Sequence, residues 1–112
     1  MPRNMSFAMT TEQFVNQTKT VTRRFGWRFL KPGDVVMGVE KGMGLKKGGK
    51  IRKLGLIKIV SVRLEPLVSI TQDDVIKEGF PDWTPLQFVL MLSDHYNVHL
   101  NSVVNRIEFK YL

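Results

Sequence analysis

The sequence predicts an α+β fold in which a small curved sheet or barrel is flanked by short helices. Helix-like and strand-like segments follow the order helix, strands, two helices, strand, with no repeating β-α-β unit and no glycine-rich nucleotide fingerprint. The chain has 112 residues, of which 43% are hydrophobic, and this is enough for one core but not for two. We therefore expect residues 1–112 to form a single domain.

The N-terminal part is predicted to contain one helix and two strands. Residues 10–17 have the pattern of a short helix, which Thr10 can cap with Gln13 as the reciprocal partner. Residues 18–24 are rich in β-branched side chains and are expected to be extended. Residues 35–40 have the pattern of a buried strand.

The middle of the chain is predicted to contain a long strand and a short helix. Residues 54–64 form an apolar strand that Pro66 ends or bends. Residues 71–79 have the pattern of a short helix, with Asp73 and Asp74 in its first turn.

A second helix is expected to begin at Thr84, with Pro85 in its first position, and to stop near residues 94–97. Trp83 and Phe88 fit a hydrophobic staple across its start. Its apolar residues are expected to be largely buried, and they are Leu86, Val89, Leu90 and Leu92.

The last segment, residues 103–112, alternates as a strand does and is expected to pair into the sheet. The apolar face is expected to carry Val103, Ile107, Phe109 and Tyr111. The opposite face is expected to carry Arg106, Glu108 and Lys110.

Charge is distributed unevenly along the chain. Residues 1–53 carry 12 basic and 3 acidic side chains, a net +9, whereas residues 54–112 carry 5 basic and 7 acidic side chains, a net −2. This asymmetry predicts a basic surface that faces an anionic partner, and nucleic acid is the commonest such partner. We do not expect a membrane surface, because the basic residues lie among glycines and not on an amphipathic helix.

Several functional classes are excluded or not expected. The chain has no cysteine, which excludes a disulfide scaffold, a thiolate zinc site and a cysteine nucleophile. It has no run of about 18 apolar residues and no apolar stretch of a signal peptide at its start, so a cytoplasmic protein is expected. His95 and His99 straddle the predicted helix end, and neither a metal site nor a cofactor is expected.

Residues 41–53 form a glycine-rich, strongly cationic loop between two predicted strands. Six of these 13 side chains are positive. The loop is either a solvated hairpin tip that keeps the protein soluble or an arm that contacts phosphate groups. The positive residues are Lys41, Lys46, Lys47, Lys50, Arg52 and Lys53.

The segment from Lys19 to Arg24 combines residue types that can carry chemistry. In a strand, Thr22 and Arg24 share one face while Lys19 and Arg23 share the other. Near a strand end, Lys19 can still reach the cleft that Thr22 faces, and Glu78 is a carboxylate that can join them. A threonine hydroxyl needs an adjacent base, and a lysine is a base only if burial or nearby positive charge lowers its pKa. The plainer alternative is a surface lysine beside ordinary strand residues.

The stretch Gln17-Thr-Lys19-Thr-Val-Thr22-Arg-Arg24 resembles the G-x-K-x-x-[ET]-x-R signature of the ASCH domains, which are small PUA-like β-barrels associated with RNA and nucleoside functions. Glu78-Gly79-Phe80 resembles the start of their second block, and residues 107–112 resemble their closing strand. The likeness covers about residues 7–40 and 54–112. This chain departs from the pattern with Gln17 in place of the glycine and with an expanded loop at 41–53.

One bacterial subgroup of that family hydrolyses the amide of N4-acetylcytidine with a Lys-x-x-Thr pair and a glutamate. The resemblance assigns these catalytic roles to Lys19, Thr22 and Glu78. Thr22 would be the nucleophile, Lys19 would activate it, and Glu78 would handle protons at the leaving amine. The resemblance thereby implies that the protein hydrolyses N-acylated cytidine.

A non-catalytic module that binds RNA or single-stranded nucleic acid is the alternative, and a metal-dependent ribonuclease, as in some ASCH relatives, is a third reading. In each case the partner is RNA or a modified nucleoside in a basic cleft built from residues 19–28 and the 41–53 loop. Phe25 and Trp27 can stack on a base, or can simply pack in the core. The residues expected to contact the ligand are Arg23, Arg24, Trp27, Arg28 and the six positive residues of the loop.

Overall fold

The computed structural model describes residues 3–40 and 51–112. Its centre is a five-stranded sheet with the strand order β1-β3-β4-β5-β2. β1 lies parallel to β3, and the other neighbouring strands are antiparallel. The strands are β1 (Arg3–Ser6), β2 (Val21–Arg24), β3 (Val35–Val39), β4 (Lys53–Pro66) and β5 (Val103–Tyr111).

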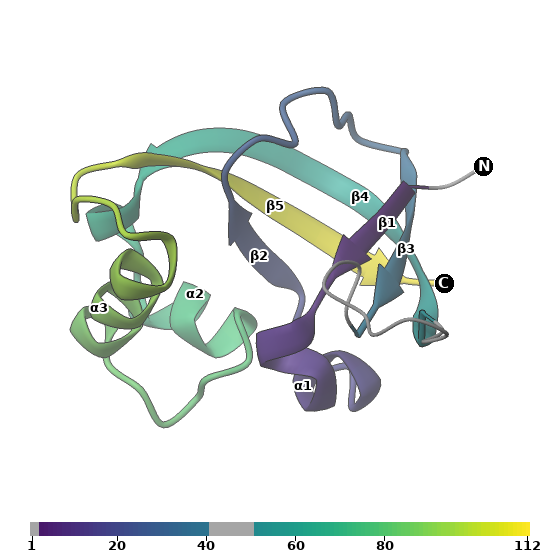
Figure 1. The fold of residues 1–112 in the computed structure, drawn as a ribbon, viewed down its shortest axis with the longest axis horizontal. Helices are drawn as coiled ribbons and strands as arrows, with labels where there is room; N and C mark the ends of the chain where they lie inside the picture. The colour runs from purple at the N-terminus through teal and green to yellow at the C-terminus, as the bar shows by residue number, and fades with distance from the viewer. Residues whose placement is uncertain (1–2, 41–50) are drawn as a thin grey trace.

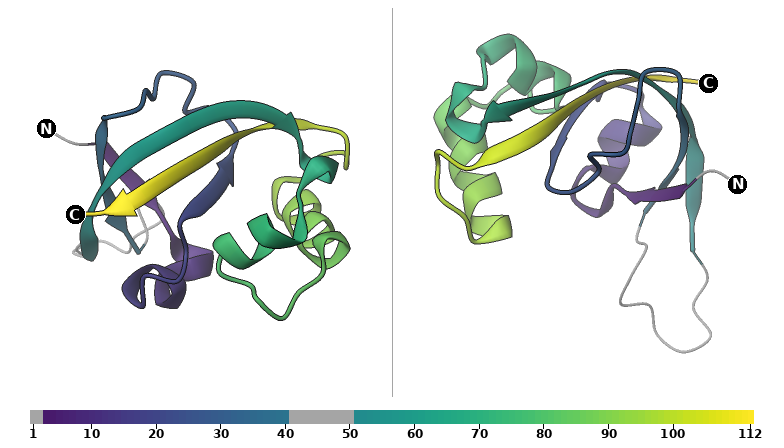
Figure 2. Two further views of the ribbon diagram at one scale, coloured as in Figure 1. Left: turned by 180° about the vertical axis from the view of Figure 1, so that it is seen from behind. Right: turned by 90° about the horizontal axis from the view of Figure 1, so that it is seen from above.

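The sheet is curled, and the helices lie on its concave side. β4 and β5 form a long arch, with α2 and α3 under one end and α1 under the other (Figure 1). The views from behind and from above show the same arrangement (Figure 2). The helices are α1 (Thr11–Val15), α2 (Gln72–Lys77) and α3 (Pro85–Tyr96), with 3-10 turns η1 (Ala8–Thr10) and η2 (Leu67–Ser69).

The predicted α+β class is confirmed, and the sheet is a half-barrel. β1 and β2 are its two edge strands in the described part of the chain. The long strand predicted at residues 54–64 is β4, and the strand predicted at 35–40 is β3. Lys53, which was expected in the loop, is the first residue of β4. None of the helices among the described residues is long and apolar enough to cross a membrane.

One apolar cluster fills the half-barrel. Phe7, Phe14 and Phe109 pack with ring centroids 4.6 to 6.3 Å apart. The ring of Phe14 lies against Gly38 of β3, where an added Cβ would come within 2.6 Å of Cε2 of Phe14. The missing side chain of Gly38 therefore lets α1 pack directly on the sheet.

A second apolar cluster joins the far end of the arch to the helices. It contains Leu67 of η2, Val75 of α2, Phe88 and Val89 of α3, and Val104 of β5. This cluster holds α2 and α3 against the sheet, and the end of α2 thereby comes close to the start of β2.

The predicted starts of α2 and α3 are confirmed. The Thr71 hydroxyl accepts a hydrogen bond from the backbone N–H of Asp74 at 3.2 Å. Thr84 and Gln87 form a reciprocal capping box at the start of α3, and the helix ends before Asn97, which has a left-handed backbone with φ 54°.

The predicted cap of α1 is wrong. Thr10 makes no side-chain cap hydrogen bond, and the Thr11 hydroxyl instead donates to the carbonyl of Phe7 at 2.9 Å. The reason is that η1 runs directly into α1, so the first turn of α1 is not a free helix end.

Two of the apolar residues expected to be buried in α3 are exposed. Leu86 is 62% exposed and Leu90 is 52% exposed, whereas Val89 and Leu92 are buried as predicted. Leu86 and Leu90 are four residues apart and therefore share the helix face that turns away from the second cluster.

The charged face predicted for β5 is partly buried. Arg106 was placed on this face with Glu108 and Lys110, and it is only 5% exposed. It is covered because α2 lies over this face of the sheet and supplies Asp74, with which Arg106 forms a salt bridge. Val103, which was placed on the apolar face, is 49% exposed at the start of the strand.

Candidate active site

A cavity of about 270 Å³ opens between the β1–η1 segment, β2, the end of α2 and α3. Its walls are largely apolar. Its polar groups come from β2, from Lys19 just before β2, from Glu78 at the end of α2 and from the last turn of α3. The apolar walls include Phe7, Met9, Phe80, Phe88, Met91 and Leu92. The polar lining includes Lys19, Thr22, Arg23, Arg24, Glu78, His95 and Tyr96. All three residues predicted to be catalytic thus line one cavity.

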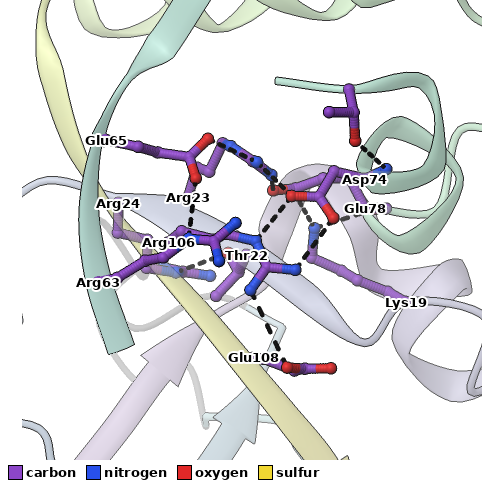
Figure 3. Close-up of polar contacts among 11 residues, drawn as sticks. Lys19, Thr22, Arg23, Arg24, Arg63, Glu65, Asp74, Glu78, Arg106 and Glu108 are labelled. Carbon is purple, nitrogen blue, oxygen red and sulfur yellow. Dashed lines mark hydrogen bonds and ion pairs between the residues drawn. The ribbon is translucent and has the colours of Figure 1, made fainter. Parts of the chain in front are cut away.

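Lys19 and Glu78 form a buried ion pair at this cavity (Figure 3). Nζ of Lys19 lies 2.6 Å from Oε1 of Glu78 and also donates to the backbone carbonyl of Glu78 at 3.0 Å. The backbone N–H of Thr20 donates to the carbonyl of Lys77 at 2.7 Å, so the chain entering β2 is tied directly to the end of α2. This contact brings Lys19 and Glu78 together across a long stretch of sequence.

Burial lowers the pKa of Lys19, and the ion pair with Glu78 opposes this effect. The neighbouring guanidinium groups of Arg24 and Arg23 lower the pKa further. A lysine that acts as a base requires a lowered pKa, because the neutral amine then forms more easily.

The Thr22 hydroxyl lies beside Arg24 on the same face of β2. Thr22 is 4% exposed, and its Oγ1 accepts a hydrogen bond from Nε of Arg24 at 3.1 Å. Within the described residues, no hydrogen bond joins Thr22 to Lys19. Arg24 also donates to the backbone carbonyl of Ser6 and lies over the ring of Phe7, 4.7 Å from its centroid. It therefore bridges the two edge strands at the open side of the half-barrel.

Arg23 belongs to a buried ion network behind the cavity. Its Nη1 donates to Oε2 of Glu78 at 2.9 Å, and its Nη2 donates to Asp74 at 2.5 Å and to Glu65 at 3.0 Å. Asp74 also accepts two hydrogen bonds from Arg106, at 2.6 and 3.0 Å. Burial lowers the pKa of Arg23, but the three carboxylates outweigh it and leave that pKa raised.

This network changes the assignments made from the sequence. Arg23 lines the cavity, and its guanidinium is bound to Glu65, Asp74 and Glu78, so its predicted contact with the ligand stays a prediction. The sequence also left open a pairing of Arg24 with Glu78, and the residue that pairs is Arg23. Arg106 was missed as a member of this network, because it lies in an alternating strand in which Glu108 and Lys110 are also charged.

The other residues predicted to contact the ligand do not line the cavity. Trp27 packs against the half-barrel cluster, and Arg28 is exposed. Arg52 pairs with Glu40 at 3.1 Å on the surface, and Lys53 is exposed at the start of β4. The remaining predicted contacts lie outside the described residues, and they are Lys41, Lys46, Lys47 and Lys50.

His95 and His99 belong to no cluster of metal ligands. In the ranges 3–40 and 51–112, no group of three potential His, Asp or Glu ligands is present. His95 does line the cavity, in the last turn of α3, which the sequence did not suggest. Tyr96 next to it packs edge-on against Phe25, with centroids 5.0 Å apart. Phe25 therefore supports the cavity wall rather than a separate stacking surface.

Comparison with known proteins identifies the fold and not a family. No family model matches the sequence, and no curated protein is significantly similar to it. Among solved structures, the chain is similar to protein EF3133 from Enterococcus faecalis V583, which is described as a member of the DUF984 family. The TM-score is 0.73 at 14% sequence identity, and the match covers 100% of this chain and 80% of that protein. The two proteins therefore share a small α+β half-barrel fold.

Proposed function

We propose that the protein is an ASCH-type hydrolase that binds a modified cytidine nucleoside in the cavity and cleaves its N4-acyl amide. The observation that carries this proposal is the meeting of Lys19, Thr22 and Glu78 at one cavity, with Lys19 buried in an ion pair 2.6 Å long. These are the three residues to which the motif resemblance gave catalytic roles. A hydroxyl, an amine and a carboxylate are also the set that acyl transfer needs.

The shape of the cavity suits a ligand of this kind. Its volume of about 270 Å³ lies near the lower end of small-molecule pockets. Phe7, Phe80 and Tyr96 give it aromatic walls against which a flat base can pack.

In the proposed reaction, a proton moves from the Lys19 ammonium to Glu78 along their 2.6 Å contact, which leaves a neutral amine. Thr22 Oγ attacks the acyl carbon as its proton passes to Lys19, and a tetrahedral oxyanion forms. The C–N bond then breaks, the leaving N4 takes a proton from Glu78, and the acyl group stays on Thr22 as an ester. Water attacks this ester with Lys19 and Glu78 handling its protons, and the acid and free Thr22 are released.

The experiment is incubation of the purified chain with N4-acetylcytidine, following both cytidine and acetate. We expect equal amounts of the two products, and a loss of at least about 10³-fold in kcat for Thr22→Ala. Thr20→Ala is the matched control, because Thr20 lies two residues before Thr22, immediately before β2 begins, and does not line the cavity. Absence of turnover, or unchanged turnover in Thr22→Ala, would refute the proposal.

A non-catalytic RNA-binding function is the second candidate, and the observation that favours it is the net +9 charge of residues 1–53. If the protein binds RNA through phosphates, affinity for a single-stranded RNA should fall linearly with salt on a log–log plot. Replacing Lys46, Lys47 and Lys50 by Gln should flatten that slope, and an unchanged slope would remove the loop from the interface. Cleavage of the RNA that EDTA stops would instead indicate the ribonuclease.

A further inference from the structure

The buried ion network behind the cavity is balanced in charge. Apart from the exposed Arg63, which also donates to Glu65, its hydrogen-bonded side chains contribute three cations and three carboxylates. They are Lys19, Arg23 and Arg106 with Glu65, Asp74 and Glu78. Both side-chain oxygens of Glu78 are used within the network, one by Lys19 and one by Arg23. The network therefore has no carboxylate oxygen of Glu78 left over for another cation at the cavity.

Arg24 is the further cation at the cavity, and no carboxylate among the described residues lies within salt-bridge distance of it. Its hydrogen-bond acceptors are neutral, namely the Thr22 hydroxyl and the Ser6 carbonyl. Residues 1–2 and 41–50, which the structure does not describe, contain no Asp or Glu. The chain therefore offers Arg24 no partner of opposite charge within contact.

Arg24 is partly buried, and a partly buried cation without a counterion is unfavourable, because the protein does not fully replace the hydration that the charge has lost. The direction of the pKa of Arg24 shows this cost, since burial lowers it. An anionic group bound at the cavity would compensate the charge, and a planar guanidinium is well suited to bind phosphate oxygens.

Two further donors lie on the same cavity. His95 and Tyr96, in the last turn of α3, both line it. In the part of the chain that is described, neither the His95 imidazole nor the Tyr96 hydroxyl makes a hydrogen bond. Arg24 and Tyr96 line the same cavity. At one opening, therefore, Arg24 has only neutral acceptors, and His95 and Tyr96 have no protein acceptor among the described residues.

We infer that Arg24, with His95 and Tyr96, forms a phosphate subsite, so that the cavity binds a nucleotide more tightly than the neutral nucleoside. The inference goes beyond the proposed function, because it concerns the charge of the ligand and holds whether or not an amide is cleaved. Only the choice of cytosine as the base rests on the proposed function. The phosphate belongs either to a free nucleotide or to an RNA chain.

The test is isothermal titration of the wild-type chain with cytidine, cytidine 5′-monophosphate, the dinucleotide CpC and inorganic phosphate. We expect the monophosphate or CpC to bind at least about 10-fold more tightly than cytidine, and inorganic phosphate to compete with it. Tighter binding of the monophosphate identifies a free nucleotide as the source, and tighter binding of CpC identifies RNA. In Arg24→Gln the advantage over cytidine should fall below about 2-fold, whereas the exposed Arg28→Gln should retain it.

Arg24 also ties β2 to the end of β1, so Arg24→Gln can weaken folding. A second measurement therefore uses the wild-type chain: cytidine 5′-monophosphate should slow phenylglyoxal modification of Arg24, mapped by mass spectrometry, and leave modification of Arg28 unchanged. The inference is overturned if neither phosphate nor nucleotide binds, if cytidine binds as tightly as both phosphate-bearing probes, or if Arg24 is not protected. None of these results depends on turnover, so a failure to release acetate counts against the proposed function alone.

Discussion

Replacing Asp74 by Asn should destabilise the protein far more than replacing its neighbour Asp73. Asp74 is 6% exposed and accepts three charge-assisted hydrogen bonds, one from Arg23 and two from Arg106. After the change, Arg23 still has Glu65 and Glu78, but the nearest carboxylate to Arg106 is Glu108 at 3.9 Å. The substitution thus leaves one largely buried arginine almost without a counterion.

The expected loss is about 3 kcal/mol, at the lower end of the cost of breaking a buried ion pair, because Arg106 keeps a distant partner. For a chain of this size, that loss corresponds to a fall in Tm of about 12 °C. Asp73→Asn removes the same charge from the first turn of α2, but Asp73 is exposed, and the loss should be at most about 1 kcal/mol. Urea unfolding at pH 7 measures both.

The pH dependence gives an independent check. The hydrogen bonds from Arg106 and then from Arg23 hold the pKa of Asp74 well below its ordinary value of 3.8. A depressed pKa means that the unfolded chain takes up this proton first, so the stabilisation is present above pH 3.8 and is lost as the pH falls below it. Between about pH 4 and 2, the wild type should lose up to about 1.4 kcal/mol per pH unit more than Asp74→Asn. Equal slopes, or equal losses for the two Asn variants at pH 7, would refute the reasoning.

Three further predictions concern the fold around the cavity. Thr84→Ala removes the capping box of α3 and should cost about 1 kcal/mol in urea unfolding, and a loss below about 0.3 kcal/mol would contradict the cap. Gly38→Ala should cost about 1–3 kcal/mol because its Cβ would meet Phe14, and Phe14→Leu in the same chain should restore part of the loss; no restoration would contradict this packing. Burial raises the pKa of Tyr111 to about 12, so an ultraviolet titration should show a late tyrosine phase, and Tyr111→Phe should abolish that phase. An unchanged late phase would disprove the assignment.

Local signals in the sequence predicted the elements well where a residue acts on its own neighbours. The cap at Thr84, the proline in the first turn of α3 and the length of β4 all follow from short-range chemistry. The prediction of a helix cap at Thr10 was wrong because η1 precedes α1 without a break. A capping pattern cannot reveal that the preceding residues are already helical.

The candidate site was predicted in part, for a similar reason. The spacing of Lys19, just before β2, and Thr22 on β2, with Glu78 at a helix end, was sufficient to propose that they meet, and they line one cavity. The partner of Glu78 was harder to predict, because Arg23 and Arg24 are adjacent and either can face the helix. Strand alternation places Lys19 and Arg23 on one face, and the structure uses both for Glu78.

Burial of charge was the feature least visible in the sequence. Arg106 lies in an alternating strand, where charged residues normally face water. Only the packing of α2 across that face decides otherwise, and this packing depends on the apolar cluster that includes Val75 and Val104. The prediction for Leu86 and Leu90 was wrong in the opposite direction, since they were expected to be buried and are exposed. A helix that is covered on one side leaves some of its apolar residues in solvent.

The strand order has a consequence for how the molecule reaches its native state. β2 hydrogen-bonds only to β5 in the described sheet, so Thr22 finds its register opposite Ile107 near the other end of the chain. A nascent or truncated chain that stops before β5 lacks the strand with which β2 pairs, so β2 is held only by its contacts with α2 and Arg24 loses the strand edge from which it reaches Ser6. Competence to bind a ligand should therefore arise in a single late step, when the last strand docks, and fragments lacking residues 103–111 should have no residual affinity.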